Sequence, residues 1–70
     1  MNKRSVRIAG HNTSITLEDE FWTAIKDIAH DRKLSVNQLI LEIDEKREGN
    51  LSSALRLYVL QYLQDRLSKQ

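Results

Sequence analysis

Residues 12–38 read NTSITLEDEFWTAIKDIAHDRKLSVNQ and contain a change of hydrophobic period. Apolar and polar side chains alternate over residues 12–17, which is the period of a strand with one buried face. From Glu18 onward the apolar side chains recur at helical spacing, and acidic residues occupy the first turn, where the helix dipole favours negative charge. We therefore expect a strand over residues 12–17 that leads directly into a helix over residues 18–32.

Two further helices are predicted after that segment. Ser35 and Gln38 have the spacing of a capping box, in which each side chain bonds to the backbone amide of the other residue. A helix is therefore expected over residues 35–47, and Gly49, in the polar run after it, is a natural helix stop. Apolar residues surround most of a final helix over residues 51–68, which predicts burial on two sides.

Residues 1–11 are expected to form a basic arm, because they contain no acidic residue. Three conformations stay open for it. Gly10 can mark a bulge that extends the strand backward, or a tight turn over residues 10–12 can pair residues 5–9 with 13–17 within one chain. The third alternative is a flexible arm. The basic residues and the histidine of the arm are Lys3, Arg4, Arg7 and His11.

The composition predicts one small domain that spans residues 1–70. The chain has 70 residues, 0 prolines, 2 glycines and 0 cysteines, so neither a disulfide nor a cysteine-bound metal can stabilise it. A chain of this size rarely buries enough apolar surface alone, and a single strand leaves an edge without a partner, so self-association is expected. The formal net charge of +1 is too small to predict nucleic-acid binding by itself.

Several classes of function are not expected. His11 and His30 are too few and too widely separated for a metal site, and no serine lies in a nucleophile motif. We therefore expect no catalytic residues, no metal, no cofactor and no enzymatic activity. Because the sequence contains no long apolar run, we expect no signal peptide and no membrane span. A soluble cytoplasmic protein is therefore expected.

The order of strand, helix and serine-initiated helix is similar to that of a known family. The likeness covers about residues 12–47. It rests mainly on three segments, residues 13–17, 18–29 and 33–40. They resemble the Arc/MetJ-like ribbon-helix-helix DNA-binding proteins, and the whole chain looks like a bacterial subgroup of that family. The resemblance implies a mostly α fold with one N-terminal β-strand and an additional C-terminal helix. It also implies a homodimer whose two strands pair as an intermolecular antiparallel β-ribbon, with higher assembly left open.

The resemblance further implies a function in transcription regulation, with the ribbon entering the major groove of double-stranded DNA. Period two places Asn12, Ser14 and Thr16 on one side of the strand, and these positions match the base-reading positions of the family. Arg7 is expected to contact bases as well. The alternative is that this side is only the solvated face of an edge strand.

Phosphate contacts are expected at the start of the second helix, because helix N-termini bind anions readily. A capping box forms at many helices without any ligand, so it is the resemblance that favours phosphate binding here. The expected phosphate-contacting residues are Arg4, Lys33, Ser35, Val36 and Asn37.

Aromatic and aliphatic residues at helical spacing are more typical of a core than of a ligand pocket. We therefore assign them, with the inward residues of the strand, to the core of the dimer. That core is expected to contain Ile15, Leu17, Phe21, Trp22, Ile25, Ile28, Val36, Leu39, Ile40 and Ile43.

A protein-interaction role is the alternative function. In an antitoxin-type module, the helix over residues 51–68 would bind a partner protein through apolar side chains such as Leu57, Leu60, Tyr62 and Leu63. Substitution of Arg7 by alanine separates the two roles, because it is expected to damage DNA binding alone.

Overall fold

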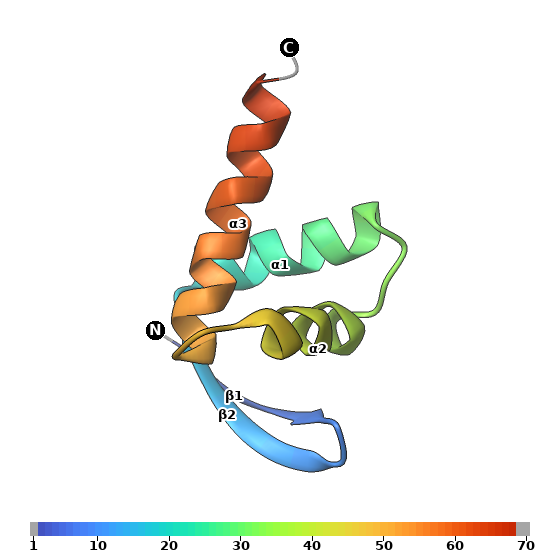
Figure 1. The fold of residues 1–70 in the computed structure, drawn as a ribbon, viewed down its shortest axis with the longest axis vertical. Helices are drawn as coiled ribbons and strands as arrows, with labels where there is room; N and C mark the ends of the chain where they lie inside the picture. Colours follow the sequence, from blue (N-terminus) through green and yellow to red (C-terminus); the bar gives the residue numbers. More distant parts are fainter. Residues whose placement is uncertain (1, 69–70) are drawn as a thin grey trace.

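The computed structural model describes residues 2–68 as an antiparallel β-hairpin followed by three helices (Figure 1). The fold is mostly helical, with the ribbon at its N-terminus and an additional helix at its C-terminus, as the resemblance implied. Each helix boundary and the start of the second strand differ from the expected ranges by no more than one residue. The elements are β1 (Asn2–Ile8), β2 (His11–Leu17), α1 (Asp19–Asp31), α2 (Val36–Lys46) and α3 (Leu51–Ser68).

The hairpin is the main difference from the expected fold, because residues 2–8 form a strand instead of a basic arm. Among the three open alternatives, the structure contains the intrachain hairpin, with its turn at Ala9-Gly10 rather than over residues 10–12. Both turn residues have positive φ, 53° and 84°. Positive φ at both central residues defines the two-residue type I′ turn, whose twist matches that of paired strands.

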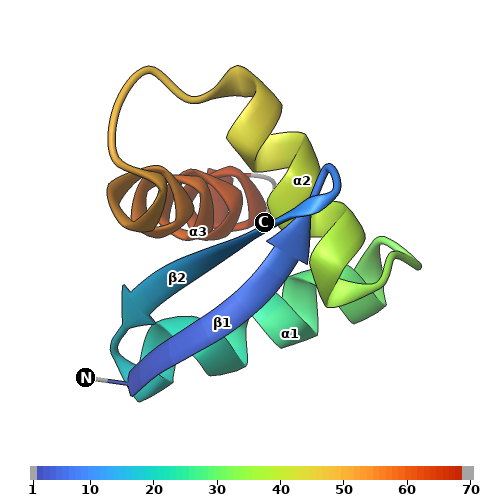
Figure 2. The same cartoon turned by 90° about the horizontal axis from the view of Figure 1, so that it is seen from below.

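The molecule has two layers, with the hairpin on one side and the helices packed on its inner face (Figures 1 and 2). Ile8, Ile15 and Leu17 point from this face into the core and are buried. In Figure 2, α3 lies beside β2, whereas the N-terminal end of α2 lies on the β1 side. The opposite face of the hairpin is not covered by any helix.

A single core joins both strands and all three helices. All of the expected dimer-core residues except Phe21 and Val36 are buried within this one chain, and those two are half-buried against it. They therefore form the core of the chain itself. The buried residues are Ile8, Ile15, Leu17, Trp22, Ile25, Ile28, Ala29, Leu39, Ile40, Ile43, Leu55 and Val59.

Local hydrogen bonds define the turn between α1 and α2. The Leu34 amide donates to the Ala29 carbonyl at 2.8 Å and the Lys33 amide to the His30 carbonyl at 3.1 Å, which is a Schellman motif. Lys33 occupies its left-handed position with φ 61°. The predicted capping box is confirmed, because Ser35 Oγ accepts from the Gln38 amide while Gln38 Oε1 accepts from the Ser35 amide.

The α3 helix packs its first half on the core, and its second half projects beyond the other elements (Figure 1). Tyr62 Oη donates a hydrogen bond to Asp31, which fastens α3 to the end of α1 and raises the pKa of the Tyr62 hydroxyl. Leucines on α3 nevertheless stay exposed: Leu57 by 60%, Leu60 by 50%, Leu63 by 48% and Leu67 by 68%.

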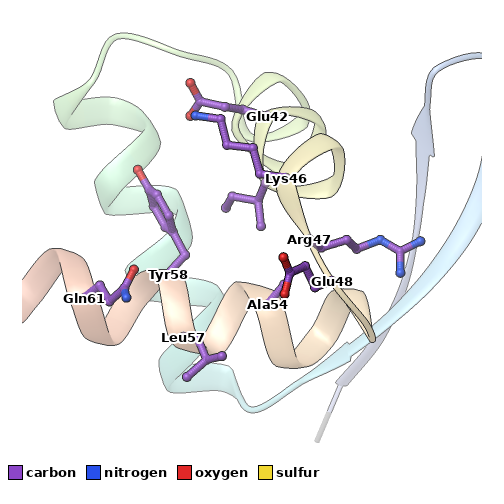
Figure 3. Close-up of a pocket in the computed structure, with 9 residues that line it drawn as sticks. Glu42, Lys46, Arg47, Glu48, Ala54, Leu57, Tyr58 and Gln61 are labelled. Atoms are coloured by element: carbon purple, nitrogen blue, oxygen red, sulfur yellow. The ribbon is translucent and has the colours of Figure 1, made fainter.

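A depression of about 470 Å³ lies between α2 and α3 (Figure 3). Ile43, Ala54, Leu57 and Tyr58 supply apolar surface to its lining. Charged and polar side chains from α2 and the following loop, together with Gln61, complete the lining. Of the exposed leucines of α3, Leu57 therefore lines a partly apolar hollow.

Candidate nucleic-acid interface

The uncovered side of the hairpin is polar along its whole length. Opposite residues of an antiparallel pair lie on the same face, and the register pairs Lys3 with Thr16, Ser5 with Ser14, and Arg7 with Asn12. All of these side chains are exposed except that of Thr16, which is half-buried. We call this surface the outer face; it consists of Lys3, Ser5, Arg7, Asn12, Ser14 and Thr16.

The outer face brings together all the residues expected to contact bases. Asn12, Ser14 and Thr16 come from β2, and Arg7 stands opposite Asn12 on β1. Sequence reasoning missed Lys3 and Ser5, because the first residues were read as an arm. A two-residue turn at Ala9-Gly10 is the signal that would have placed Lys3 and Ser5 on the outer face. Such a turn sets the register in which Lys3 lies opposite Thr16 and Ser5 lies opposite Ser14.

The electrostatic character of the hairpin is basic. Residues 2–17 contain three cationic side chains and no acidic one, and Lys3 and Arg7 lie on the outer face. The next acidic residue, Glu18, accepts a hydrogen bond from Arg56 Nε at 2.9 Å. That bond holds the pKa of the Glu18 carboxyl below its usual value. A basic, hydroxyl-rich and amide-bearing surface without acids suits a polyanion.

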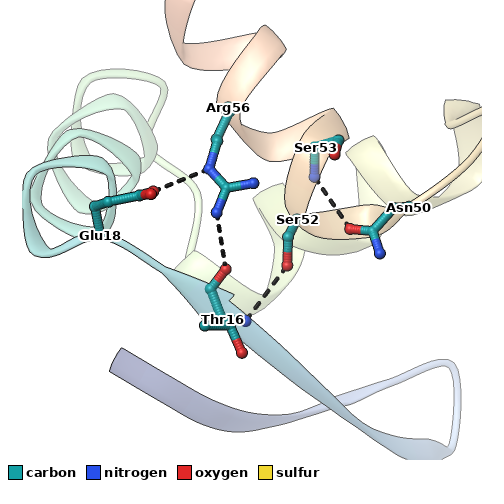
Figure 4. Close-up of polar contacts among 6 residues, drawn as sticks. All are labelled: Thr16, Glu18, Asn50, Ser52, Ser53 and Arg56. Atoms are coloured by element: carbon teal, nitrogen blue, oxygen red, sulfur yellow. Dashed lines mark hydrogen bonds and ion pairs between the residues drawn. The ribbon is translucent and has the colours of Figure 1, made fainter. Parts of the chain in front are cut away.

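Thr16 differs from its neighbours because α3 holds its backbone (Figure 4). Its amide donates to Ser52 Oγ at 3.3 Å, and its carbonyl accepts from Arg56 Nη2 at 3.4 Å. The first turn of α3 is itself capped by Asn50, whose Oδ1 accepts from the Ser53 amide at 3.2 Å. The N-terminus of α3 is therefore fastened along the outer edge of β2.

Arg4, an expected phosphate contact, lies on the other side of the hairpin. It pairs with Ile15, so it shares the face that packs on the helices. Its guanidinium carbon lies 5.1 Å from the ring centroid of Trp22, which is a cation–π distance. Arg4 thus covers the buried indole, and the outer face does not include it.

The other expected phosphate contacts cluster at the start of α2. Lys33, Ser35 and Asn37 are exposed and Val36 is half-buried. The first amides of a helix have no intrahelical acceptor, so this turn presents N–H donors next to the Lys33 ammonium. Neighbouring Arg32 is engaged elsewhere, since it donates to Glu42 and, at 2.8 Å, to the Tyr58 hydroxyl.

Residues 2–68 contain neither a cluster of metal ligands nor a helix that could span a membrane. Nowhere in this range do three histidine, aspartate or glutamate side chains gather as metal ligands would. Of the helices described, none combines the length and apolarity needed to cross a membrane. The basic, hydroxyl and amide side chains of the outer face make it the surface whose chemistry most clearly suggests a ligand.

Comparison with known proteins agrees with this geometry. A family model described as a ribbon-helix-helix domain matches residues 1–63, which is most of the chain and includes both strands. No curated protein and no solved structure gives a match. The family match supports a DNA-binding, regulatory role in general terms. On the extent of this match, the chain belongs to the ribbon-helix-helix family.

Proposed function

We propose that this protein binds double-stranded DNA sequence-specifically as a homodimer and acts as a cytoplasmic transcriptional repressor without enzymatic activity. The observation that carries the proposal is the outer face, where every side chain is polar or basic and none is acidic. The core backs this face from the other side, so the hairpin presents its side chains on a rigid support.

The dimensions and chemistry of the hairpin suit the major groove, which is about 12 Å wide and admits a two-stranded ribbon. Arg7 can donate two hydrogen bonds to a guanine, and Asn12 can pair bidentately with an adenine. Ser14 and Thr16 supply hydroxyls for several base edges. Lys33, Ser35 and the amides of Val36 and Asn37 would hold flanking phosphates and make the affinity dependent on salt.

Arg7→Ala tests the proposal most simply, with Lys26→Ala as the matched control. Each change removes one cation, but Lys26 is exposed on α1 and lies outside the outer face. We expect Arg7→Ala to weaken binding to a labelled duplex by about 10-fold or more, since a bidentate base contact contributes about 1–3 kcal/mol. Lys26→Ala should have little effect, and equal losses in both variants would contradict the proposal.

Selection from a pool of random duplexes tests sequence specificity. A homodimer should enrich a site with pseudo-twofold symmetry, because half-sites follow the symmetry of the protein. Arg7→Ala should relax the preference at one position of each half-site. Binding that is salt-sensitive but enriches no site would support only non-specific DNA binding.

A protein-interaction role is the second candidate function, and the exposed leucines of α3 favour it. Leu57 lines the depression between α2 and α3, and Leu60, Leu63 and Leu67 are exposed further along the same helix, so α3 offers apolar side chains that an amphipathic helix of a partner protein can contact. Leu60→Glu should then abolish partner binding and leave DNA affinity unchanged. If Leu60→Glu leaves the partner bound, this second role is wrong.

A further inference from the structure

One side of α3 is rich in leucine and faces away from the core. Leu55 and Val59 point into the core and are buried. Residues two positions apart on a helix lie on nearly opposite sides, so Leu57 points outward. The exposed residues on this outward side recur at intervals of four and three along the helix. We call them the α3 seam; they are Ser53, Leu57, Leu60, Gln64 and Leu67.

Alternating intervals of four and three residues are the spacing of a coiled coil, in which such a strip is buried against another helix. The α3 helix needs no partner in order to form, because Leu55 and Val59 already hold it on the core. Its second half projects beyond the other elements, so a second helix can lie along it there (Figure 1). The seam therefore has both the spacing and the access that helix pairing requires.

The charge pattern of the seam favours a second copy of the same helix. None of the five seam residues is ionisable, although 30% of the chain is charged. Arg56, which flanks the seam, is bonded to Glu18 at 2.9 Å. Charges beside a coiled-coil seam select different partners by attraction and exclude identical ones by repulsion. Without such charges, the seam is complementary to itself.

The order of residues along the seam favours a parallel pair. In a parallel pair each seam residue meets its own counterpart, so all three leucines meet leucines and Gln64 meets Gln64. An antiparallel pair that sets Leu57 against Leu60 leaves Leu67 opposite Asn50. The other antiparallel register sets Leu57 against Leu67 and leaves Leu60 opposite Gln64. A pair of facing amides can bond to each other, and one polar layer of this kind fixes the register.

We propose that the α3 seam pairs with the α3 seam of a second copy of this chain, as a short parallel coiled coil. The homodimer that the resemblance implies is joined through strands, so the seam is a separate contact that can join one dimer to another. It covers about two heptads, fewer than the roughly three or four of a sustained coiled coil, so the contact is weak and reversible.

The parallel orientation has a consequence for DNA binding, which rests on the proposed function. The hairpin lies near the N-terminal end of α3 (Figure 1). A parallel pair therefore places both hairpins at the same end of the assembly, where both outer faces can contact one duplex. Dimers joined in this way bind neighbouring sites cooperatively, because the first dimer raises the local concentration of the second.

Cysteine crosslinking tests the seam directly, because the chain has 0 cysteines of its own. Residues at one seam position of a parallel pair face each other, which brings two cysteines within disulfide range. Gln64→Cys should therefore give a covalent dimer on oxidation. Asp65→Cys is the matched control, since Asp65 is exposed beside Gln64 but lies off the seam, and it should not crosslink.

Every other crosslinking result overturns the proposal. In both antiparallel registers the two copies of Gln64 lie apart, so a missing Gln64→Cys crosslink rejects the parallel pair. Crosslinking of neither variant leaves the seam to a partner protein. Equal crosslinking of both variants, or crosslinking of Asp65→Cys alone, rejects a contact centred on the seam.

Sedimentation equilibrium of two glutamate variants provides the second test. Leu60 lies on the seam and is 50% exposed; Leu63 is 48% exposed but lies off the seam, where it lines a hollow beside α1. Leu60→Glu buries two opposed carboxylates in the pair, whereas Leu63→Glu does not. The parent protein and Leu63→Glu should therefore reach a larger mass than Leu60→Glu at high concentration. Equal masses for all three, or an equal loss in both variants, overturn the proposal.

A duplex that carries two neighbouring copies of the selected site separates the seam from the proposed function. Leu60→Glu should lose the cooperativity between the two sites and keep the affinity for a single site. A Gln64→Cys crosslink in a chain that binds no duplex would retain the seam contact and reject the proposed function. DNA binding by a chain that gives no such crosslink would reject the seam contact and retain the function.

Discussion

Two residues of this chain hold a backbone conformation that their side chains disfavour. Ala9 has φ 53° in the hairpin turn, and Lys33 has φ 61° at the end of α1. Neither is glycine, and the left-handed region costs a residue with a Cβ about 1–2 kcal/mol. Substitutions at Ala9 and Lys33 therefore measure the cost of the backbone conformation separately from the contacts of the side chain.

Ala9→Asn should stabilise the fold. Asparagine followed by glycine is the preferred pair for a type I′ turn, because asparagine tolerates positive φ. We expect the free energy of unfolding to rise by about 0.5–1 kcal/mol in urea denaturation. Gly10→Ala is the control of opposite sign: nothing lies within 4 Å of its added Cβ, so any loss of stability comes from the backbone alone, at φ 84°.

Lys33→Gly should change stability and DNA affinity in opposite directions. Glycine is favoured at the left-handed position of a Schellman motif, so the variant should be more stable by about 0.5–1 kcal/mol. It also removes a proposed phosphate contact, so binding should weaken and the slope of log K against log salt should shrink by about 1. If the DNA affinity is unchanged, Lys33 does not contact DNA. The predicted gain in stability from glycine at the left-handed position would still stand.

At the scale of elements, α3 is joined to the hairpin by Arg56, which bonds both Glu18 and the Thr16 carbonyl. The hydrogen bond from Arg56 is the largest cause that lowers the pKa of Glu18. The hydrogen bond from Arg32 lowers the pKa of Glu42 in the same way, where α1 meets α2. Both carboxylates are thus more acidic folded than unfolded.

The fold should therefore lose stability at acid pH. The ionised carboxylates stabilise the folded state above their unfolded pKa, about 4.3 for glutamate, and this contribution disappears as pH falls through the lower folded values. Glu18→Gln should be less stable than the parent protein at neutral pH, and the difference should vanish in acid. A difference in unfolding free energy that does not depend on pH would show that the Glu18 charge is not involved.

The helices could be predicted from the sequence, whereas the hairpin was one of three alternatives that the sequence left open. Ser35, Gln38 and the apolar spacing around them are local signals, and local signals were enough for α2. The β1 strand depends on a turn in which Ala9 adopts positive φ. Ala-Gly is not one of the residue pairs that are typical of such a turn. While the position of the turn was open, the sequence did not determine on which face of the hairpin Lys3, Arg4 and Ser5 lie.

At the scale of the whole molecule, a single copy of the chain buries the core that the sequence predicted for a dimer. The third helix explains the difference, since Leu55 and Val59 of α3 complete the core that the hairpin, α1 and α2 form. In the proposed homodimer, the second copy would then add width and symmetry to the DNA-contacting surface rather than bury the core. We therefore expect dilution to weaken DNA binding before it reduces helical content.

Dilution can be followed by circular dichroism and by DNA binding on the same samples. Helical signal that stays constant while DNA affinity falls would support a chain that folds alone and binds as a dimer. Loss of both signals together would indicate that folding requires the second copy, against the single-chain core described above.

The central claim is that the outer face of the hairpin binds duplex DNA, and amide chemical-shift mapping during titration with a duplex tests it most directly. The account predicts the largest changes at Lys3, Ser5, Arg7, Asn12 and Ser14, smaller ones at the start of α2, and little change at Leu60 and Leu63. Changes concentrated on α3, with the hairpin amides unmoved, would contradict it.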